Sequence, residues 1–255
     1  MIPRYYRVSE SAHEIQNPTS EEKLRLLGTR IGLGPESRVL DIASGRGGPA
    51  LVLALAFGCI VEGIEIEPAF QEVALARAKE LGLSDRVTFR VEDASAVDLP
   101  EEAYDAALCL GATFVYGGLP ETVAALAPTV KPRGHVAVGE VFWRRLPLPV
   151  DYEDRDLPLT TMEGTVRVFE TEGLPVVSLI ESSADDWDRY ETLHWHSVER
   201  WLAENAADSE AEDIRARYER HKWTYLRYQR ELMGWAIFVG WKCPPRYDVS
   251  SRRST

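Results

Sequence analysis

The chain has 255 residues, of which 45% are hydrophobic, and its formal net charge at pH 7 is −12. This length suits one α/β domain with an added segment. The acidic charge disfavours a nucleic-acid partner, because proteins that bind DNA or RNA need a basic face. No stretch approaches the roughly 20 apolar residues of a membrane span, and residues 1–16 lack the apolar centre of a secretion signal. We therefore expect a cytoplasmic protein without nucleic-acid or membrane partners.

The cysteines Cys59, Cys109 and Cys243 lie far apart in the sequence and show no metal-type spacing. Cys59 and Cys109 fall in apolar segments, as buried free thiols do. We therefore predict reduced thiols and no metal site.

Residues 17–143 alternate between helical and strand patterns. The first helix is predicted at 17–33, where Thr19 and Glu22 have capping-box spacing and Gly34-Pro35 ends the helix. Strands are predicted at 37–43, 59–66, 86–91, 104–112 and 134–143. Further helices are predicted at 48–57, 68–83 and 119–130. This alternation is typical of a parallel sheet with helices on both faces.

The pattern changes in the second half of the chain. A segment rich in proline and acidic residues, 144–160, is predicted to be a loop or lid. The elements expected after it are a helix at 161–174, a strand at 175–182, two long helices at 185–206 and 209–232, and a last strand at 234–242. The two long helices are rich in Trp and Tyr, so we expect them to cover an apolar site.

The segment VLDIASGRGGPALVLA, residues 39–54, runs from a strand through a glycine-rich turn into a helix, which is typical of nucleotide-binding loops. Gly45, Gly47 and Gly48 let the backbone approach a ligand closely. A dinucleotide fingerprint needs glycine at position 43, where this chain has Ala43. The turn alone leaves three alternatives open: a dinucleotide site, an S-adenosylmethionine site, or a tight turn that binds nothing.

Three carboxylates lie near this turn, and two of them, Asp41 and Asp93, favour S-adenosylmethionine. Glu65 follows Gly45 by 20 residues and stands where an acid accepts hydrogen bonds from ribose hydroxyls, as both cofactors require. Asp41 precedes the turn, where a buried acid attracts a sulfonium or ammonium group but repels a pyrophosphate. Asp93 follows the third strand, where its side chain can bind an adenine amino group.

Val39–Gly47, Glu65, Asp93–Ala94 and Val130–Gly134 together resemble the motif series of class I S-adenosylmethionine-dependent methyltransferases. Other segments, among them VSESAHEIQNPTSEEKLRLLG, CLGATFVYGG and DDWDRYE, resemble the YjhP-type bacterial methyltransferases along nearly the whole chain. One departure is Ala43, where the family usually has glycine; it is mild if the backbone angle is ordinary. The resemblance implies a Rossmann-like, seven-stranded, mostly parallel α/β sheet, with its antiparallel last strand between strands five and six.

We accordingly predict a domain organisation and a cofactor site. Residues 1–36 form an N-terminal segment with a lid helix, 37–182 and 233–244 the cofactor-binding methyltransferase domain, 183–232 a helical cap over the acceptor pocket, and 245–255 a flexible tail. The implied cofactor is S-adenosylmethionine, which leaves as S-adenosylhomocysteine. The residues expected to surround it are Asp41, Ala43, Ser44, Gly45, Gly47, Glu65, Ile66, Asp93, Ala94 and Leu110.

Methyl transfer requires alignment of donor and acceptor, and a base where the acceptor must lose a proton. His13 is one catalytic candidate, because Glu10, three residues earlier, can hold it by a hydrogen bond; a surface or capping histidine is the alternative. Glu140 is another candidate, since a charge inside the fifth strand needs either a role or a partner. The alternative is that Glu140 has a structural role and forms a salt bridge with Arg144 or Arg145.

Three aromatic residues are predicted to contact the acceptor. Tyr116 and Trp143 lie at strand ends on the expected active edge, and Tyr190 lies on the insertion; core packing is the alternative, above all for Trp143. Aromatic walls favour an apolar or aromatic acceptor and can stabilise a cationic methyl group. A weaker resemblance, to enzymes that methylate indole rings of tryptophan-containing cyclic dipeptides, suggests an indole-containing compound. His194 and His196 are expected to serve packing or to lie at the surface.

The sequence thus predicts an enzyme that transfers a methyl group from S-adenosylmethionine to a small molecule. A non-catalytic S-adenosylmethionine-binding module and an NAD(P)-dependent Rossmann oxidoreductase are the alternatives. The expected partner is the small-molecule methyl acceptor, and a homodimer is left open.

Overall fold

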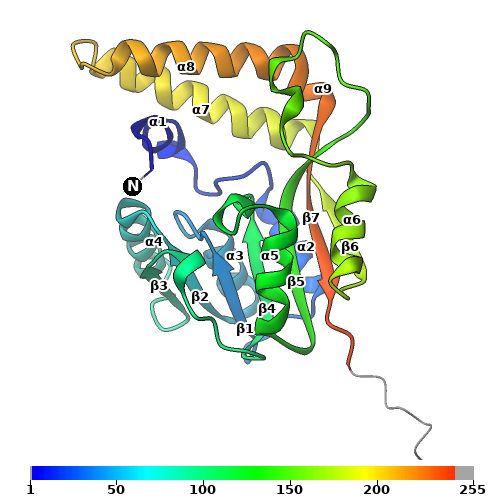
Figure 1. The fold of residues 1–255 in the computed structure, drawn as a ribbon. Coiled ribbons are helices and arrows are strands. Elements are labelled where there is room, and N and C mark those ends of the chain that lie inside the picture. The colour runs from blue at the N-terminus through cyan, green and yellow to red at the C-terminus, as the bar shows by residue number, and fades with distance from the viewer. Residues whose placement is uncertain (1, 245–255) are drawn as a thin grey trace, which may run out of the picture.

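The computed structural model describes residues 2–244, in which seven strands form one sheet in the order β3-β2-β1-β4-β5-β7-β6 (Figure 1). The strands are β1 (Arg38–Ile42), β2 (Ile60–Glu65), β3 (Val87–Val91), β4 (Tyr104–Leu110), β5 (Val130–Trp143), β6 (Val176–Glu181) and β7 (Met233–Trp241). The pairs from β3 to β5 are parallel, and β7 runs antiparallel to its neighbours β5 and β6. The predicted fold class is confirmed. The predicted flexible tail, 245–255, lies outside the described residues.

Helices cover both faces of the sheet. They are α2 (Glu21–Arg30), α3 (Gly48–Phe57) and α4 (Pro68–Glu80) on one face, and α5 (Leu119–Leu126) and α6 (Met162–Thr171) on the other. Side chains of β1 alternate between the two layers: Val39 packs with the first group and Leu40 with the second. α3 has its predicted bounds, because Gly47 and Gly58 flank it in the left-handed conformation. Of the helices within residues 2–244, none has the length and hydrophobicity that crossing a bilayer demands.

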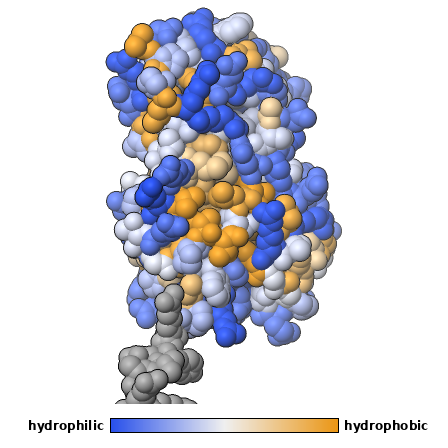
Figure 2. Space-filling model, turned by 90° about the vertical axis from the view of Figure 1, so that its right-hand side faces the viewer, coloured by the Kyte–Doolittle hydropathy of each residue, from blue (hydrophilic) through white to orange (hydrophobic). Residues whose placement is uncertain are grey.

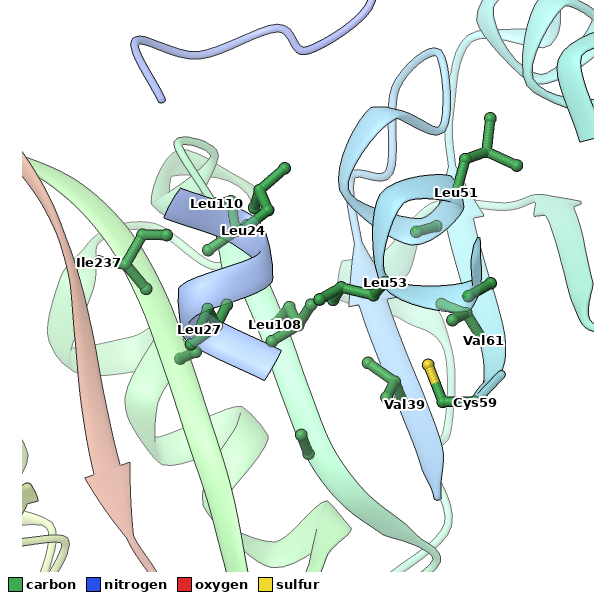
Figure 3. Packing of buried hydrophobic residues seen from close by; sticks show 14 of the residues in the cluster. Leu24, Leu27, Val39, Leu51, Leu53, Cys59, Val61, Leu108, Leu110 and Ile237 are labelled. Carbon is green, nitrogen blue, oxygen red and sulfur yellow. The ribbon is translucent and has the colours of Figure 1, made fainter. Parts of the chain in front are cut away.

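One core cluster lies between the first group of helices and the sheet (Figure 3). Leu24 and Leu27 of α2 and Leu53 of α3 are fully buried there, together with Val39 of β1 and Leu108 of β4. Burying each leucine stabilises the fold by about 1.5–3 kcal/mol relative to leaving it exposed. This packing holds α3, and with it the loop before α3, firmly against the sheet.

α2 begins later than the sequence pattern predicts. Its N-cap is Ser20, whose side chain accepts a hydrogen bond from the backbone N–H of Lys23 at 3.3 Å, so the predicted capping box of Thr19 and Glu22 is wrong. Thr19 is instead fully buried, and its carbonyl oxygen accepts a hydrogen bond from the side chain of Arg189. Tertiary packing has taken precedence over the local capping pattern.

A helical cap lies beyond the C-terminal ends of the parallel strands (Figure 1). Its elements are α7 (Ala184–Glu204), α8 (Ala211–Thr224), a π-helical turn (Tyr225–Gln229) and α9 (Arg230–Leu232). The single helix predicted at 209–232 is therefore interrupted by the π-helical turn. α1 (Arg4–Ser9) packs against this cap, because Tyr5 and Val8 join a cluster with Val198 and Tyr218. The N-terminal segment is thus attached to the cap before it reaches the sheet.

β6 forms one edge of the sheet and exposes apolar side chains. Val177 and Leu179 of this strand are 54% and 38% exposed, and Figure 2 shows hydrophobic residues gathered on this side of the molecule. An exposed edge strand with apolar side chains is a surface on which a second chain can pair. The homodimer left open by the sequence stays a prediction.

Candidate active site

The glycine-rich turn forms a tight loop between β1 and α3. Three of its residues adopt the left-handed backbone region: Ala43 at φ 53°, Gly45 at φ 55° and Gly47 at φ 77°. Glycine adopts this conformation freely, whereas an alanine in it costs roughly 1–2 kcal/mol. The replacement of the motif glycine by Ala43 is therefore strained, and the backbone angle there is not an ordinary one.

Glu65, at the end of β2, is bonded to the glycine loop. Its Oε2 atom accepts a hydrogen bond from the backbone N–H of Gly45 at 2.8 Å, and its Oε1 atom accepts one from the backbone N–H of Glu67 at 2.9 Å. Each carboxylate oxygen keeps a further lone pair with which it can accept a hydroxyl hydrogen. Burial raises the pKa of Glu65, although these two hydrogen bonds oppose the rise.

Asp41, in β1, has a buried carboxylate, and one of its oxygen atoms has no partner among the described residues. Its side chain is almost fully buried, and its Oδ2 atom has no hydrogen-bond partner among residues 2–244. Burial and the nearby charge of Glu65 raise the pKa of Asp41 to about 7. A ligand with a positive charge or an N–H donor satisfies such a carboxylate, and S-adenosylmethionine carries both as its sulfonium and ammonium groups. The residues present therefore fit the cofactor that the sequence implies.

The structure brings the predicted cofactor residues together at one edge of the sheet. They are Asp41, Ala43, Ser44, Gly45 and Gly47 at the end of β1 and in the loop after it, Glu65 and Ile66 at the end of β2, Asp93 and Ala94 after β3, and Leu110 at the end of β4. Ile66 and Asp93 are exposed, so both can contact a ligand, whereas Ala94 and Leu110 are buried. Hydrogen bonds from the hydroxyl and the backbone N–H of Ser95, at 2.7 and 3.0 Å, hold Asp93 and lower its pKa.

The N-terminal segment that follows α1 crosses the glycine loop. Gln16 Oε1 accepts a hydrogen bond from the backbone N–H of Arg46 at 2.7 Å, and Asn17 Nδ2 donates one to the carbonyl oxygen of Leu110 at 3.2 Å. The sequence analysis did not identify Gln16 or Asn17 as site residues. Their partners lie 30 and 93 residues away along the chain, so no local spacing indicates these contacts.

Glu140 lies in β5 next to the end of β4. Its Oε2 atom accepts a hydrogen bond from the Thr113 hydroxyl at 2.5 Å, and its Oε1 atom accepts one from the backbone N–H of Val141 at 2.7 Å. The predicted salt bridge with Arg144 or Arg145 is wrong, because both arginines pair with carboxylates of other elements. Burial raises the pKa of Glu140, despite its two hydrogen bonds. The carboxylate is thus oriented by neutral donors, and within residues 2–244 it forms no ion pair.

A cavity of about 510 Å³ lies between α1, the cap helices α7 and α8, and the short 3₁₀ helix Glu153–Asp156. Its walls are aromatic on one side, with Tyr5, Tyr6 and Tyr190, and ionisable elsewhere. The ionisable residues are Glu10, Glu153, Asp154, Glu191, His194, Arg217, Arg220 and His221. None of the predicted cofactor residues lines this cavity. The N-terminal segment connects the two places, because Glu10 lines the cavity and Gln16, six residues later, bonds the glycine loop.

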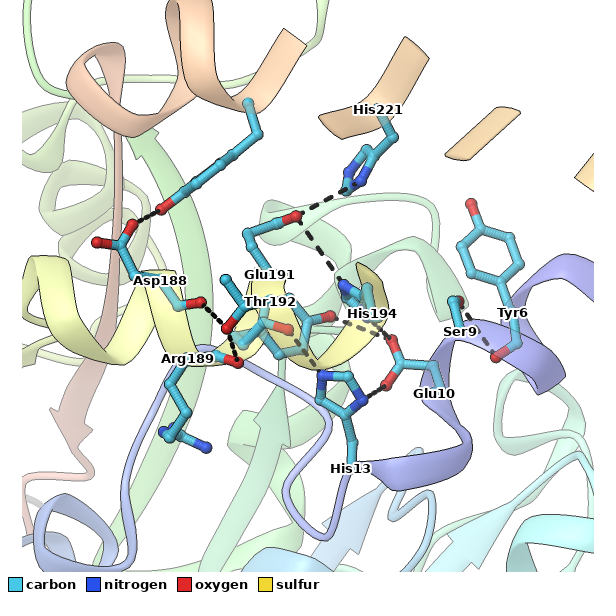
Figure 4. A network of polar contacts seen from close by, with 12 residues as sticks. Tyr6, Ser9, Glu10, His13, Asp188, Arg189, Glu191, Thr192, His194 and His221 are labelled. Atoms are coloured by element: carbon cyan, nitrogen blue, oxygen red, sulfur yellow. Dashed lines mark hydrogen bonds and ion pairs between the residues drawn. The ribbon is translucent and has the colours of Figure 1, made fainter. Parts of the chain in front are cut away.

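A polar network forms part of this cavity wall (Figure 4). Glu10 Oε1 lies 2.9 Å from His194 Nε2 and accepts a hydrogen bond from the Tyr190 hydroxyl at 3.2 Å. His13 is fully buried, and its Nε2 atom bonds the carbonyl oxygen of Tyr190 at 2.9 Å. His13 Nδ1 lies 3.7 Å from Glu10 Oε2, which is too long for the predicted hydrogen bond between them.

Burial and nearby charges shift the pKa values of His13 and His194 in opposite directions. Burial lowers the pKa of His13. Burial acts in the same direction on His194, but its hydrogen bond to Glu10 and the nearby carboxylates of Glu10 and Glu191 raise the pKa of His194 to about 9. His194 was expected to serve packing or the surface; it is instead buried at the centre of the network.

Of the aromatic residues predicted to contact the acceptor, only Tyr190 is among those that line this cavity. Trp143 is buried and packs edge-to-face on Tyr152, with ring centroids 6.0 Å apart, in a cluster beneath the 144–160 loop. Tyr116 is half-buried at the end of β4, and burial raises its pKa to about 12. Phe114, two residues earlier, is 78% exposed there and was not identified from the sequence.

Comparison with known proteins shows what this arrangement resembles. Residues 39–134 match a family described as a methyltransferase domain. Over 243 residues the chain is 36% identical to the protein YjhP of Escherichia coli, an alignment that covers 93% of this chain and 98% of YjhP.

Solved structures agree with this result. An S-adenosylmethionine-dependent methyltransferase from Geobacter sulfurreducens, in complex with S-adenosyl-L-homocysteine, has a TM-score of 0.88 and 36% identity over 94% of this chain and 98% of that protein. A counterpart from Thiobacillus denitrificans, also in complex with S-adenosyl-L-homocysteine, has a TM-score of 0.87 and 34% identity, with coverage of 94% and 98%.

These similarities include the cap as well as the sheet, because nearly all of each chain is aligned. They decide between the cofactors that the glycine loop left open, in favour of S-adenosylmethionine and against a dinucleotide. The chain therefore belongs to the class I S-adenosylmethionine-dependent methyltransferases, in the group that includes YjhP.

Proposed function

We propose that this methyltransferase acts on a small molecule with an aromatic or apolar body and at least one polar group, bound in the cavity under the cap. The cavity carries this proposal. Its volume of about 510 Å³ lies within the usual range for small-molecule sites, about 300–1,000 Å³. Tyr5, Tyr6 and Tyr190 offer faces for a ring, and the ionisable side chains around them offer partners for polar atoms. An indole-containing compound is one member of this class.

The chain contributes chiefly binding and orientation. S-adenosylmethionine supplies the electrophilic methyl group. Asp41 would face the positive charge of the bound cofactor and Glu65 would hold its ribose. The segment with Gln16 and Asn17, which is bonded to Arg46 and Leu110, would keep water out of the site. Holding two reactants in line contributes roughly 7–11 kcal/mol to a reaction of this kind.

Glu140 is the proposed proton acceptor where the methyl acceptor must lose a proton. Its carboxylate stands at the cofactor-binding edge of the sheet, and burial raises its pKa toward the range in which a base works. A base of this kind typically contributes about 10²–10⁴-fold to the rate. Glu10, in the cavity wall, is proposed to hold the polar end of the acceptor, with the buried His13 packed behind it.

The test is a search for the acceptor with a labelled methyl group. The protein is incubated with labelled S-adenosylmethionine and a bacterial metabolite extract, and labelled products are identified by mass spectrometry. We expect one labelled aromatic or apolar small molecule, whose formation disappears in Glu65→Ala. Label found only in macromolecules, or only in strongly polar aliphatic compounds, would overturn the proposed acceptor class.

Glu140→Gln tests the proton acceptor once the product is known. We expect kcat to fall about 10²-fold at the pH optimum while the affinity for S-adenosylhomocysteine stays unchanged. The matched control is Glu181→Gln, because Glu181, at the end of β6, is another carboxylate of the sheet and is paired with Arg144. Equal effects of the two substitutions would exclude a special role for Glu140.

A further inference from the structure

Three buried side chains of the kind that bind metal ions lie together at the cavity, and two of them, Glu10 and His194, line it. Glu10, His13 and His194 each offer one ligand atom, and these atoms all lie within 4.8 Å of one another. All three residues are buried, and they come from two separate elements: the segment after α1 and the cap helix α7 (Figure 4). We infer that they form a binding site for one divalent transition-metal ion of the zinc type.

His13 presents a free lone pair to this group. Its Nε2 atom must carry a hydrogen, because that atom bonds the carbonyl oxygen of Tyr190. In the neutral imidazole that carries its hydrogen on Nε2, the Nδ1 atom is the acceptor, and Nδ1 has no hydrogen-bond partner among residues 2–244. The second nitrogen of a metal-bound histidine commonly donates to a backbone carbonyl in this way, which fixes the ring and its tautomer.

Two acceptors therefore face each other in a buried place. His13 Nδ1 and Glu10 Oε2 are 3.7 Å apart, and neither atom finds a hydrogen-bond donor within the described part of the chain. Their lone pairs repel unless a cation lies between them. Two ligands of a tetrahedral zinc ion, each about 2.1 Å from the metal, are themselves about 3.4 Å apart. The observed separation is close to this value and too long for a direct hydrogen bond.

His194 supplies the third ligand and has a carboxylate behind it. Its Nε2 atom lies 2.9 Å from Glu10 Oε1, and its Nδ1 atom lies 4.0 Å from Glu191 Oε2. At 4.0 Å this carboxylate is too distant for a hydrogen bond, but its negative charge makes the ligating ring more basic. Without an ion, His194 Nε2 is paired with Glu10 Oε1, and an arriving ion would replace this contact.

The ligand set determines the kind of ion and where it would act. Two imidazoles and one carboxylate suit zinc and its transition-metal neighbours, whereas magnesium and calcium prefer sets made of oxygen. Three protein ligands leave a coordination position open, and Glu10 and His194 both line the cavity. An oxygen of the acceptor can fill this position. That last role rests on the proposed function, whereas binding of the ion does not.

The competing interpretation is an ion pair between Glu10 and protonated His194, with no metal. His194→Lys distinguishes the two, because lysine keeps the positive charge opposite Glu10 but removes a metal ligand at neutral pH. Glu10→Gln removes the carboxylate. The matched control is His196→Gln, since His196 lies on the same helix and is exposed. All variants carry Cys243→Ser, because Cys243 is an exposed thiol that can bind zinc by itself.

The experiment is calorimetric titration of the full chain, first stripped of metal with a chelator, with zinc chloride and with magnesium chloride. We expect one zinc ion per chain, at least about tenfold weaker zinc binding in Glu10→Gln and in His194→Lys, unchanged binding in His196→Gln, and no magnesium binding. Thermal unfolding, with and without zinc, establishes that each variant is folded and shows whether zinc stabilises it.

Two results would overturn the site: no zinc binding by the folded parent protein, or binding that both substitutions leave intact. S-adenosylhomocysteine is titrated into the same samples as a separate measurement. A variant that loses zinc binding but still binds S-adenosylhomocysteine has lost the metal site alone. A parent protein that binds no S-adenosylhomocysteine contradicts the proposed function and leaves the metal site to be judged by the zinc titration.

Discussion

The side-chain oxygen of Gln16 accepts a hydrogen bond from the backbone N–H of Arg46, so the N-terminal segment is fastened directly onto the glycine loop. A Cβ atom at Gly45, the neighbouring residue, would lie 2.2 Å from that oxygen. The closed position of the segment therefore depends on the absence of a side chain at position 45.

Gly45→Ala is expected to open this contact. The added methyl group displaces Gln16, and the backbone at φ 55° disfavours an alanine. We expect the dissociation constant of S-adenosylhomocysteine to rise at least about tenfold, which isothermal titration calorimetry measures. Gly32→Ala is the control, because Gly32 has a similar φ of 69° with no neighbouring atom within 4 Å of an added Cβ. If Gly45→Ala and Gly32→Ala bind S-adenosylhomocysteine equally well, the contact between Gln16 and the glycine loop does not contribute to cofactor binding.

Glu65→Ala is expected to weaken cofactor binding by at least about tenfold, because one charged hydrogen-bond acceptor contributes about 1.5–3 kcal/mol. The substitution also leaves the backbone N–H of Gly45 without its present acceptor. Titration of S-adenosylhomocysteine measures the loss. Glu92→Ala is a suitable control, since Glu92 follows β3 and pairs with Arg90. An unchanged affinity in Glu65→Ala would contradict the assignment of the ribose site.

Asp41 makes the cofactor-free protein less stable as the pH rises. Its native pKa of about 7 lies above the ordinary value of 3.8, so the native state holds a proton that the unfolded chain releases between these values. The contribution of Asp41 to the free energy of unfolding is therefore fully present below about pH 4 and is lost as the pH rises toward 7. Asp41→Asn should be more stable than the parent protein at about pH 8, by an amount on the order of 2 kcal/mol, and the gain should shrink toward pH 5.

Urea unfolding of both proteins without cofactor, at about pH 5 and pH 8, measures this difference. If Asp41→Asn raises the free energy of unfolding by the same amount at both pH values, the pKa of Asp41 in the native protein is its ordinary one. The parent protein saturated with S-adenosylmethionine serves as the comparison, because a bound positive charge favours the ionised carboxylate and removes the pH dependence.

Ala43→Gly is expected to stabilise the protein by about 1 kcal/mol, because glycine adopts φ 53° without strain. Ala50→Gly is the matched control: Ala50 lies inside α3 with ordinary helical geometry, and the same change there costs about 1 kcal/mol. Chemical unfolding curves give both values. A destabilised Ala43→Gly would mean that another constraint sets the loop conformation.

The order of strands and helices was predictable because each element carries its own signal. Gly47, Gly58 and Gly82, each with a positive φ, end or begin helices where the sequence pattern indicated. The positions of Glu65 and Asp93 at the strand ends follow from the alternation of elements alone. These features depend on short stretches of chain, and short stretches are what a sequence pattern describes.

Contacts between distant segments were not predictable in this way. Glu140 pairs with Thr113, 27 residues away, and not with the arginines that follow it closely. His194 meets Glu10 across 184 residues, and nothing in the spacing of either residue indicates the other. Thr19 has the residue type of a helix cap, but burial assigns it another role. In each case the fold, and not the local pattern, selects the partner.

The place of β7 between β5 and β6 has a consequence for the newly made chain. β6 leaves the ribosome before β7 does, yet its hydrogen bonds in the sheet are with β7. Ile237, at the centre of β7, is fully buried and pairs with both neighbours. During synthesis β5 and β6 must therefore wait, with their facing edges unpaired, until the last strand inserts between them. Completion of the sheet therefore comes late, and until then the unpaired edges of β5 and β6 expose the chain to aggregation.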